Sequence, residues 1–297
     1  WKLGVLNDPF NYAKYTTQSN GKVLYETTLD EAQIPKQSFA ANKVITVIDN
    51  RQTNLQKIVT DIMSKFNPES SYVHLGYEAV TLSSETAKLL GNKTDGREVQ
   101  MSGRKGLYIN ADEIIEKLEK RIYLESKERN TSLDDASLNE IAHNVANGTI
   151  RYELIKPDLD KIITFDINTS LKLEGDTCSY IQYSCVRAAR ILEKSDKKPD
   201  FNASFDQLNT EHDLNLIKQI GMFEIFVNDA AKNYSPKVIA KYCYGLAVAF
   251  SSFYEHAKVL KAETPELVNA RLCLVLSFGL TLEKALDLLG ITVPQRM

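Results

Sequence analysis

The chain has 297 residues, of which 43% are hydrophobic, with 36 Lys and Arg against 39 Asp and Glu. This composition excludes a disordered or fibrous chain, and the length suffices for two domains with a buried core. The formal charge of -3 excludes nucleic-acid binding by bulk positive charge alone, although it allows a shaped site with a few basic groups. The longest apolar run, 244–250, is far too short to cross a bilayer, and no secretory signal is visible.

The first third of the chain alternates short apolar runs with turn residues, which is typical of strands. A turn at Ser19-Asn-Gly21 precedes a predicted strand over 22–25. The continuous β-branched run 44–48 predicts a buried strand, and a helix over 55–65 and a strand over 71–75 follow it. Strand, polar turn, helix and strand in this order predict a βαβ unit, and hence a parallel sheet.

Polar residues follow both strands of this unit, over 49–52 and from His74 to Tyr77. Ligands of parallel sheets bind at the carboxyl ends of the strands, so these positions are where chemistry is expected. A lone histidine such as His74 is more often a hydrogen-bonded structural residue than a general base. The sequence shows neither a catalytic triad in chain order nor a His-Glu-x-x-His zinc motif, which argues against a hydrolase.

A glycine-flanked basic segment, Met101-Ser-Gly-Arg-Lys-Gly106, follows the α/β part. Backbone N–H groups and two adjacent cations in such a loop can contact a polyphosphate. Neither cation needs to move a proton, because its contribution is to stabilise the charge that builds up during displacement at phosphorus. A solvated surface loop has the same composition, and the pattern alone does not separate the two interpretations.

The apolar period becomes helical from Ala111 onward, and a polar stretch at 126–135 marks a domain boundary. We expect an α/β domain over 1–126, with a partial Rossmann-like parallel sheet, and an all-helical domain over 127–297. Within the latter, 162–165 is predicted to be extended, and Asp176 or Thr177 is predicted to cap the next helix. The predicted helices are 136–154, the one capped there that runs to Glu193, 212–233, 236–260, 264–279 and 281–289.

Three residues of the helix that ends at Glu193 have a pattern found at single-stranded nucleic-acid sites. Tyr180, Tyr183 and Arg187 are spaced i, i+3 and i+7, so they lie on one helix face. Aromatic rings interleaved with arginine can stack bases and hold phosphates of single-stranded nucleic acid. A core helix whose tyrosines pack inward and whose arginine extends to solvent has the same pattern, and on these residues alone the core helix is the favoured interpretation.

The cysteines form no Cys-x-x-Cys pair and lack the histidine partners of zinc sites. We therefore predict no metal site and expect reduced core thiols in a cytosolic protein. The four residues are Cys178, Cys185, Cys243 and Cys273.

Five segments, taken in chain order, resemble arginyl-tRNA synthetases, which are class I enzymes. Two departures from the family pattern are visible: Tyr25 precedes Asp30 by five residues instead of four, and Gln100 and Gly103 stand where the KMSKS loop has lysines. The similar segments are Tyr25 with Asp30 (a Tyr-x-x-x-Asp element), 47–52 (a strand end whose glutamine contacts arginine), 101–106 (the KMSKS loop), 173–187 (the entry to the anticodon-binding domain) and 289–297 (the family's ending).

The resemblance implies a class I catalytic domain followed by a DALR-type anticodon-binding helical bundle. It implies ATP-dependent activation of L-arginine and its transfer to the 3′ end of arginine tRNA, with ATP acting together with Mg²⁺. The ATP site would then comprise Met101, Ser102, Gly103, Arg104 and Lys105, with His74.

Two further groups of residues receive a role from the same resemblance. Asp30 would pair with the cationic arginine substrate, while Tyr25 and Gln52 orient it. The residues that would approach the anticodon are Tyr180, Tyr183, Arg187 and Met297.

The family's His-Ile-Gly-His signature and its amino-terminal domain for the tRNA elbow are absent from this sequence, which opens at Trp1. We therefore expect the carboxyl-terminal portion of a longer enzyme, inactive by itself, cytoplasmic, monomeric and without membrane contact. The alternative is a free-standing synthetase-like fragment that holds tRNA without catalysis. A cysteine or methionine enzyme of the same class is disfavoured, because zinc-type cysteine clusters are missing.

Overall fold

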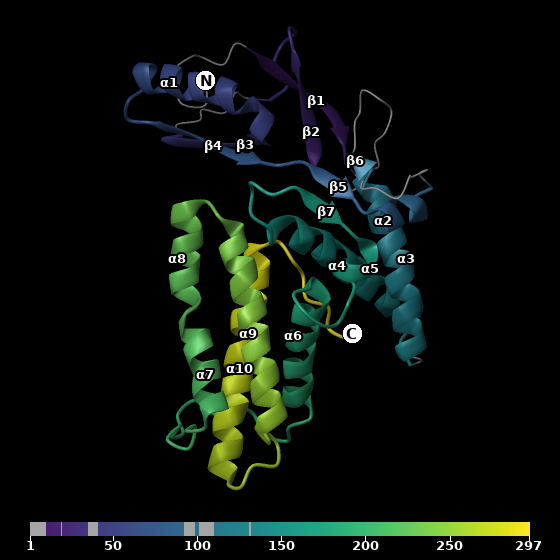
Figure 1. Ribbon diagram of the computed structural model, residues 1–297, viewed down its shortest axis with the longest axis vertical. Coiled ribbons are helices and arrows are strands. Elements are labelled where there is room, and N and C mark those ends of the chain that lie inside the picture. Colours follow the sequence, from purple (N-terminus) through teal and green to yellow (C-terminus); the bar gives the residue numbers. More distant parts are fainter. Residues whose placement is uncertain (1–9, 19, 35–40, 92–98, 101–109, 131) are drawn as a thin grey trace. The chain divides into compact units, whose positions relative to one another are not determined.

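The computed structural model in Figure 1 describes residues 10–18, 20–34, 41–91, 99–100, 110–130 and 132–297. The chain divides into two compact units, Trp1–Glu78 and Ala79–Met297, which we call the α/β unit and the helical unit. The predicted fold class, an α/β part followed by an all-helical part, is confirmed. The predicted domain boundary after residue 126 stays a prediction, because a division by contacts does not show where a functional domain ends.

A β-hairpin opens the described part of the α/β unit. Strands β1 (Asn11–Thr17) and β2 (Val23–Thr28) pair antiparallel, with an irregularity between Lys14 and Thr16. Gly21 closes the turn at a φ of 80°, a left-handed conformation that glycine adopts without strain. The strand predicted over 22–25 is β2.

A parallel pair of strands follows the hairpin. Strand β3 (Lys43–Asp49) pairs with β4 (Ser71–Tyr77), and the short turn η1 (Asn50–Gln52) and helix α1 (Thr53–Phe66) connect them. The predicted βαβ unit is therefore confirmed. The register places Asp49 opposite Tyr77, so both strands end at the same edge of the sheet.

The prediction that the run 44–48 is buried is wrong for one face of β3. Gln56 of α1 reaches the other face, where it contacts Thr46, but Ile45 and Val47 are 45% and 61% exposed. Parallel sheets are normally covered on both faces. In the described part of the chain β3 has one neighbouring strand, β4, and α1 packs on that pair, which leaves the second face to solvent.

A small sheet begins the helical unit, with β5 (Val80–Leu82) between the antiparallel β6 (Val99–Gln100) and the parallel β7 (Ile163–Phe165). Strand β7 is the stretch predicted to be extended. Helix α2 (Ser84–Leu89) follows β5, and α5 (Ile167–Ser170) follows β7. The two helix starts are joined, since the Ser83 hydroxyl donates to Asp166 Oδ2 at 2.5 Å.

The remaining described helices form the body of the unit (Figure 1). Helices α3 and α4 pack against each other, and α9 contacts α6, α7, α8 and α10. The bounds are α3 (Ala111–Arg129), α4 (Asp135–Ile155), α6 (Cys178–Glu193), α7 (Glu211–Gly221), α8 (Phe223–Asn233), α9 (Pro236–His256) and α10 (Pro265–Leu288).

Two predicted helix boundaries are wrong. The helix predicted over 212–233 is two helices, because the chain turns at Gly221 and Met222 and both halves pack on α9. The helices predicted over 264–279 and 281–289 are one, α10. Gly279 does not end it, since this glycine lies where α10 packs on α6: a Cβ atom there would sit 4.0 Å from the Cβ of Ala188. Tertiary packing thus overrides the low helix propensity of glycine.

The core of the helical unit is aromatic and aliphatic. The rings of Phe250 and Phe278 are fully buried and stack with centroids 3.9 Å apart. A buried ion pair joins Arg271 to Asp213 at 3.3 Å, with 7% and 0% of the side chains exposed. All four cysteines are free and buried, as predicted.

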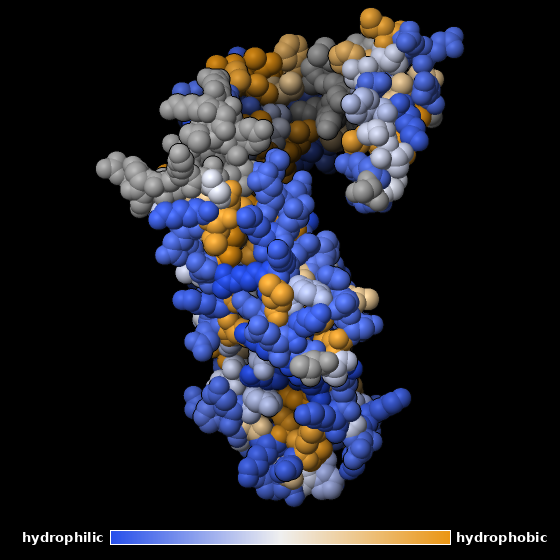
Figure 2. All heavy atoms as spheres, turned by 90° about the vertical axis from the view of Figure 1, so that its right-hand side faces the viewer, coloured by the Kyte–Doolittle hydropathy of each residue, from blue (hydrophilic) through white to orange (hydrophobic). Residues whose placement is uncertain are grey.

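Helix α10 is the one described helix that is long and apolar enough to cross a membrane by length and composition, and half of its most apolar window is buried inside the unit. A core helix passes the same test. On the face that Figure 2 shows, hydrophilic residues cover most of the helical unit, and hydrophobic residues reach the surface in small patches.

Candidate nucleic-acid interface

Helix α6 carries the residues for which RNA binding was predicted. Its cap is Thr177, one of the two predicted, whose hydroxyl oxygen accepts the N–H of Tyr180 at 3.2 Å. Ile181 and Cys185 of the same helix are buried in the core. Tyr180, Tyr183 and Arg187 are half-buried, so they lie at the border between the core-facing side of the helix and solvent.

Arg187 lies between two tyrosine rings. Its guanidinium carbon is 4.7 Å from the ring centroid of Tyr183 and also 4.7 Å from that of Tyr254, which is on α9. Each such contact contributes roughly 0.5–1 kcal/mol at an exposed site. Sequence reasoning missed Tyr254, because only the packing of α6 on α9 brings it to this place and no local pattern marks it.

Tyr180 lies outside this stack. Its ring makes an edge contact with Tyr244, with centroids 6.0 Å apart and an angle of 60° between the ring planes. It packs against the core of the helical unit. The structure therefore brings two of the four predicted anticodon residues, Tyr183 and Arg187, into one stack, and the role of Tyr180 stays a prediction.

Two pockets share Tyr183 and Arg190 in their walls, with volumes of about 450 Å³ and about 380 Å³. These volumes lie in the range of small-ligand sites. Both walls are largely apolar and each includes basic side chains, with Glu125 as the acidic residue of the larger pocket. The principal further lining residues are Arg129, Ser179 and Met297 for the larger pocket and Arg187, Lys194 and Tyr254 for the smaller.

Ser179 and Met297 both line the larger pocket. The Ser179 hydroxyl is buried and makes no hydrogen bond within the described part of the chain. Met297 lines the same pocket, and its backbone oxygen lies 3.5 Å from Nη2 of Arg190. The predicted anticodon residue Met297 thus shares this pocket wall with Tyr183.

The predicted phosphate-contacting loop lies outside the described residues, so the structure does not test its assignment. The described chain enters it through β6 and leaves it at Asn110, which precedes α3. The residues concerned are Met101, Ser102, Gly103, Arg104 and Lys105.

The strand ends of the α/β unit hold polar residues, as predicted. Arg51 forms a fork on Asp49, with Nε donating at 2.9 Å and Nη2 at 2.7 Å. The side chain of Arg51, and then its backbone N–H, lower the pKa of Asp49 to about 2. Asn50 donates to Glu78 at 3.0 Å, and a Cβ atom at Gly76 would lie 1.9 Å from Asn50 Oδ1, so a larger residue there would displace this side chain.

The other predicted site residues of this unit make few contacts. His74 Nε2 lies 3.0 Å from the backbone oxygen of Ile48, which is the structural arrangement considered for it. Tyr25 is 51% exposed on β2, and Asp30 Oδ2 accepts a hydrogen bond from the Thr28 hydroxyl at 3.3 Å. Gln52, His74, Tyr25 and Asp30 are not hydrogen-bonded to one another in this described region. Their roles stay predictions.

The comparisons with known proteins agree with the sequence resemblance. Residues 181–297 match the DALR anticodon binding domain. An arginine–tRNA ligase of Borrelia hermsii is 33% identical over 96% of this chain and 47% of its own length, and one of Deinococcus radiodurans is 31% identical over 100% and 49%. The solved arginyl-tRNA synthetase of Thermus thermophilus has 30% identity and a TM-score of 0.81, over 100% of this chain and 47% of that one.

The chain thus spans about half the length of the relatives that it matches. The matched domain begins within α6 and includes Tyr183, Arg187 and Tyr254. The resemblance is therefore confirmed: the chain is similar over nearly its whole length to part of the arginine–tRNA ligases, and its residues 181–297 match a DALR anticodon binding domain.

Proposed function

We propose that this chain is the part of an arginine–tRNA ligase that binds arginine tRNA by its anticodon and supplies part of the site for ATP and arginine. One observation carries the proposal: Arg187 lies between Tyr183 and Tyr254, and Tyr183 also lines two pockets whose walls include Arg190. Unstacked bases of an RNA loop pack on such rings, and the guanidinium contacts their phosphates. The match of 181–297 to an anticodon binding domain supports it.

The complete protein would join L-arginine to the 3′ end of arginine tRNA, with MgATP as the second substrate. Ser102, Arg104 and Lys105 would stabilise the charge on the phosphates as pyrophosphate leaves, without moving a proton. Asp30 would pair with the substrate guanidinium, and Tyr25 and Gln52 would orient it. The support for these roles is the similarity of the segments to those of the family.

The binding half of the proposal is tested with a stem–loop RNA that carries an arginine anticodon. Tyr254→Ala and Tyr183→Ala should each weaken binding by roughly 1–3 kcal/mol, because each removes a ring on which a base stacks. Tyr15→Ala, on the exposed hairpin, is the matched control and should leave the affinity unchanged. Equal affinity of the wild-type chain for the stem–loop and for a scrambled loop would overturn the proposal.

The catalytic half is tested in the complete protein. Lys105→Ala should lower the rate of ATP–pyrophosphate exchange far more than it lowers tRNA affinity. A normal rate with weakened tRNA binding would show that the loop is wrongly assigned.

An RNA-holding protein without catalysis is the second candidate, because the described site residues that contact one another, Arg187 with Tyr183 and Tyr254, belong to the RNA-binding half of the proposal alone. The two candidates differ in one assay. A complete native polypeptide that binds arginine tRNA but neither exchanges pyrophosphate nor charges tRNA would support the second.

We also propose a cytoplasmic location and a monomeric state. The four buried free thiols support the location, since reduced core cysteines suit a reducing compartment. Fractionation of native cells and sedimentation of the purified chain test the two parts.

A further inference from the structure

Two residues at the end of α4, Tyr152 and Lys156, donate hydrogen bonds to Asp176 in the turn that precedes α6. Tyr152 Oη donates to Asp176 Oδ1 at 2.5 Å, and Lys156 Nζ donates to the backbone oxygen of Asp176 at 2.8 Å. One residue of the turn is thereby fixed through its side chain and its backbone at once. Two anchors on one residue restrict both the position and the orientation of that peptide.

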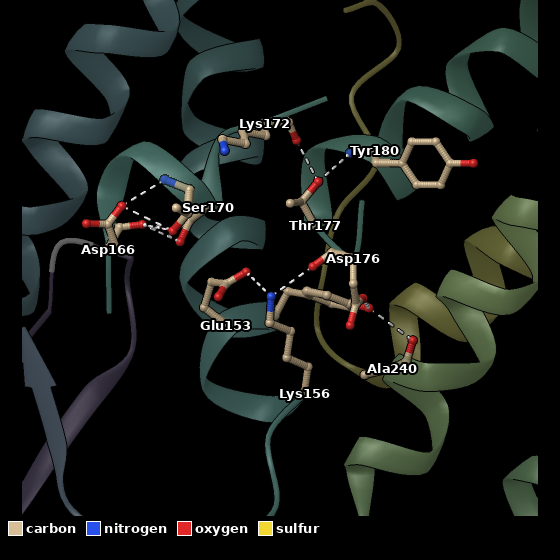
Figure 3. A network of polar contacts seen from close by, with 11 residues as sticks. Glu153, Lys156, Asp166, Ser170, Lys172, Asp176, Thr177, Tyr180 and Ala240 are labelled. Carbon is tan, nitrogen blue, oxygen red and sulfur yellow. Dashed lines mark hydrogen bonds and ion pairs between the residues drawn. The ribbon is translucent and has the colours of Figure 1, made fainter. Parts of the chain in front are cut away.

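Lys156 is directed inward by a second charged group. Figure 3 shows its ammonium between Glu153 and Asp176, and the bond to Glu153 Oε1 is 2.7 Å long. Only 26% of the Lys156 side chain and 15% of the Glu153 side chain are exposed. A half-buried lysine with two acceptors is oriented toward them, so it is not available as a phosphate contact on the surface.

The anchored turn leads directly into the cap of α6. Gly175 has a φ of 78°, and Thr177 donates its hydroxyl to the backbone oxygen of Lys172 at 2.6 Å. The same hydroxyl accepts the N–H of Tyr180, as Figure 3 also shows. The direction in which α6 starts is therefore set by the residues that Tyr152 and Lys156 hold.

Tyr152 also contacts α9, the second of the two helices whose residues form the aromatic–arginine stack of Tyr183, Arg187 and Tyr254. Its ring is fully buried, and its hydroxyl oxygen is 3.3 Å from the backbone oxygen of Ala240 on α9. Helix α9 carries Tyr254, and α6 carries Tyr183 and Arg187. The single side chain of Tyr152 thus lies next to both helices whose residues form the aromatic–arginine stack.

We propose that Tyr152 and Lys156 are positioning residues for RNA binding: they fix the 172–177 turn, and with it the start of α6, so that Tyr183 and Arg187 are ordered before the RNA arrives. This inference rests on the proposed function of the stack. An interface whose side chains are already ordered loses less entropy on binding, so its affinity is higher. Neither residue contacts the RNA itself.

The test is a charge-neutral double variant, Glu153→Gln/Lys156→Met, which removes the Lys156 anchor without leaving an unpaired charge and keeps the bond from Tyr152. Its matched control is Asp160→Asn/Lys161→Met, an exposed pair 4.0 Å apart in the same unit. The anchor variant should bind the arginine stem–loop roughly three- to tenfold more weakly, since each side chain that must be ordered costs this much. The control should bind as the wild type does. Lys156→Arg can still donate to both Glu153 and the backbone oxygen of Asp176, so this single variant should keep most of the wild-type affinity.

Hydrogen exchange separates positioning from unfolding. The anchor variant should lose amide protection in the peptides that span 172–183 and keep it in α10, because the anchor acts only on the start of α6. Wild-type affinity in a variant with exposed 172–183 amides would overturn the inference while the proposed function stands. Equal loss of protection throughout the unit would also overturn it, since the residues would then stabilise the whole fold. Failure of the wild-type chain to bind the stem–loop would overturn both.

Discussion

Phe278 of the helical unit is fully buried in a stack with Phe250, whereas Phe66 of the α/β unit is 70% exposed at the end of α1. The same contrast extends along α1, whose Leu55 and Ile58 are 54% and 56% exposed. Both regions show clear helical or strand periodicity. The pattern of apolar residues therefore shows which face a helix or strand would bury, and the rest of the fold decides whether something covers it.

This contrast indicates that the helical unit owes its stability to its own core, while the α/β unit does not cover its apolar faces with described residues. The relatives are about twice as long as this chain. Four experiments test the contrast, and they are ordered from the largest expected effect to the smallest.

Replacing a buried ring should have the largest effect. Phe278→Ala is expected to lower the free energy of unfolding of the helical unit by about 3–5 kcal/mol, because it removes a stacked ring and leaves a cavity. Phe66→Ala is the matched change on α1 and should alter stability by less than about 0.5 kcal/mol. Urea unfolding followed by circular dichroism measures both. A comparable cost at Phe66 would show that α1 is covered in solution, and the contrast would fail.

Side-chain capping at the helix start is present in α6 of the helical unit and missing in α1 of the α/β unit. Thr177 caps α6 with its side chain, whereas Gln52, at the start of α1, makes no side-chain cap bond. Thr177→Ala should cost about 1–2 kcal/mol in the free energy of unfolding, since the first turn loses a hydrogen-bond acceptor. Gln52→Ala should cost less than about 0.5 kcal/mol. Equal costs would mean that Gln52 caps α1 in solution.

Burial raises the pKa of Glu153 in the helical unit, and the hydrogen bond from Lys156 opposes this shift. A raised pKa in the folded state means that folding favours the protonated carboxyl, so its contribution to stability is full below the ordinary value and is lost as the pH rises through the raised pKa. Relative to Glu153→Gln, the wild type should therefore lose up to about 1.4 kcal/mol per pH unit in that window. Urea unfolding at a series of pH values measures this difference. A wild type that gains stability with pH would show that the ion pair outweighs burial.

The pKa of Asp49 in the α/β unit is shifted in the opposite direction, to about 2, by its bonds to Arg51. A lowered pKa contributes stability that is present above the ordinary value of 3.8 and is lost as the pH falls through about 2. A carbon-detected NMR titration of the Asp49 carboxyl should give this midpoint, and Arg51→Gln should return it toward 3.8. A wild-type midpoint near 3.8 would show that the fork on Asp49 is not formed in solution.

Local sequence signals predicted the positions of helices, strands and caps better than they predicted what packs against them. The order of β3, α1 and β4 and the cap at Thr177 follow from neighbouring residues, and both are present. The burial of Ile45 and the continuity of α10 through Gly279 depend on what packs against them. Such contacts come from distant parts of the chain, so periodicity alone could not predict them.

The candidate interface shows the same division. Spacing along α6 placed Tyr183 and Arg187 on one helix face, and the structure has them in contact. Tyr254 completes the stack from another helix, and Lys156 holds the preceding turn from a third. Neither position has a local signal, because the relation between helices exists only in the folded unit.

The burial of the four thiols has a consequence for measurement. Burial raises the pKa of each, that of Cys243 to about 12, and a protonated, inaccessible thiol does not react with disulfide reagents. Two of these cysteines, Cys178 and Cys185, lie on α6, the helix that carries Tyr183 and Arg187. The rate at which each thiol becomes labelled therefore reports how often that part of the helical unit opens, without any added probe.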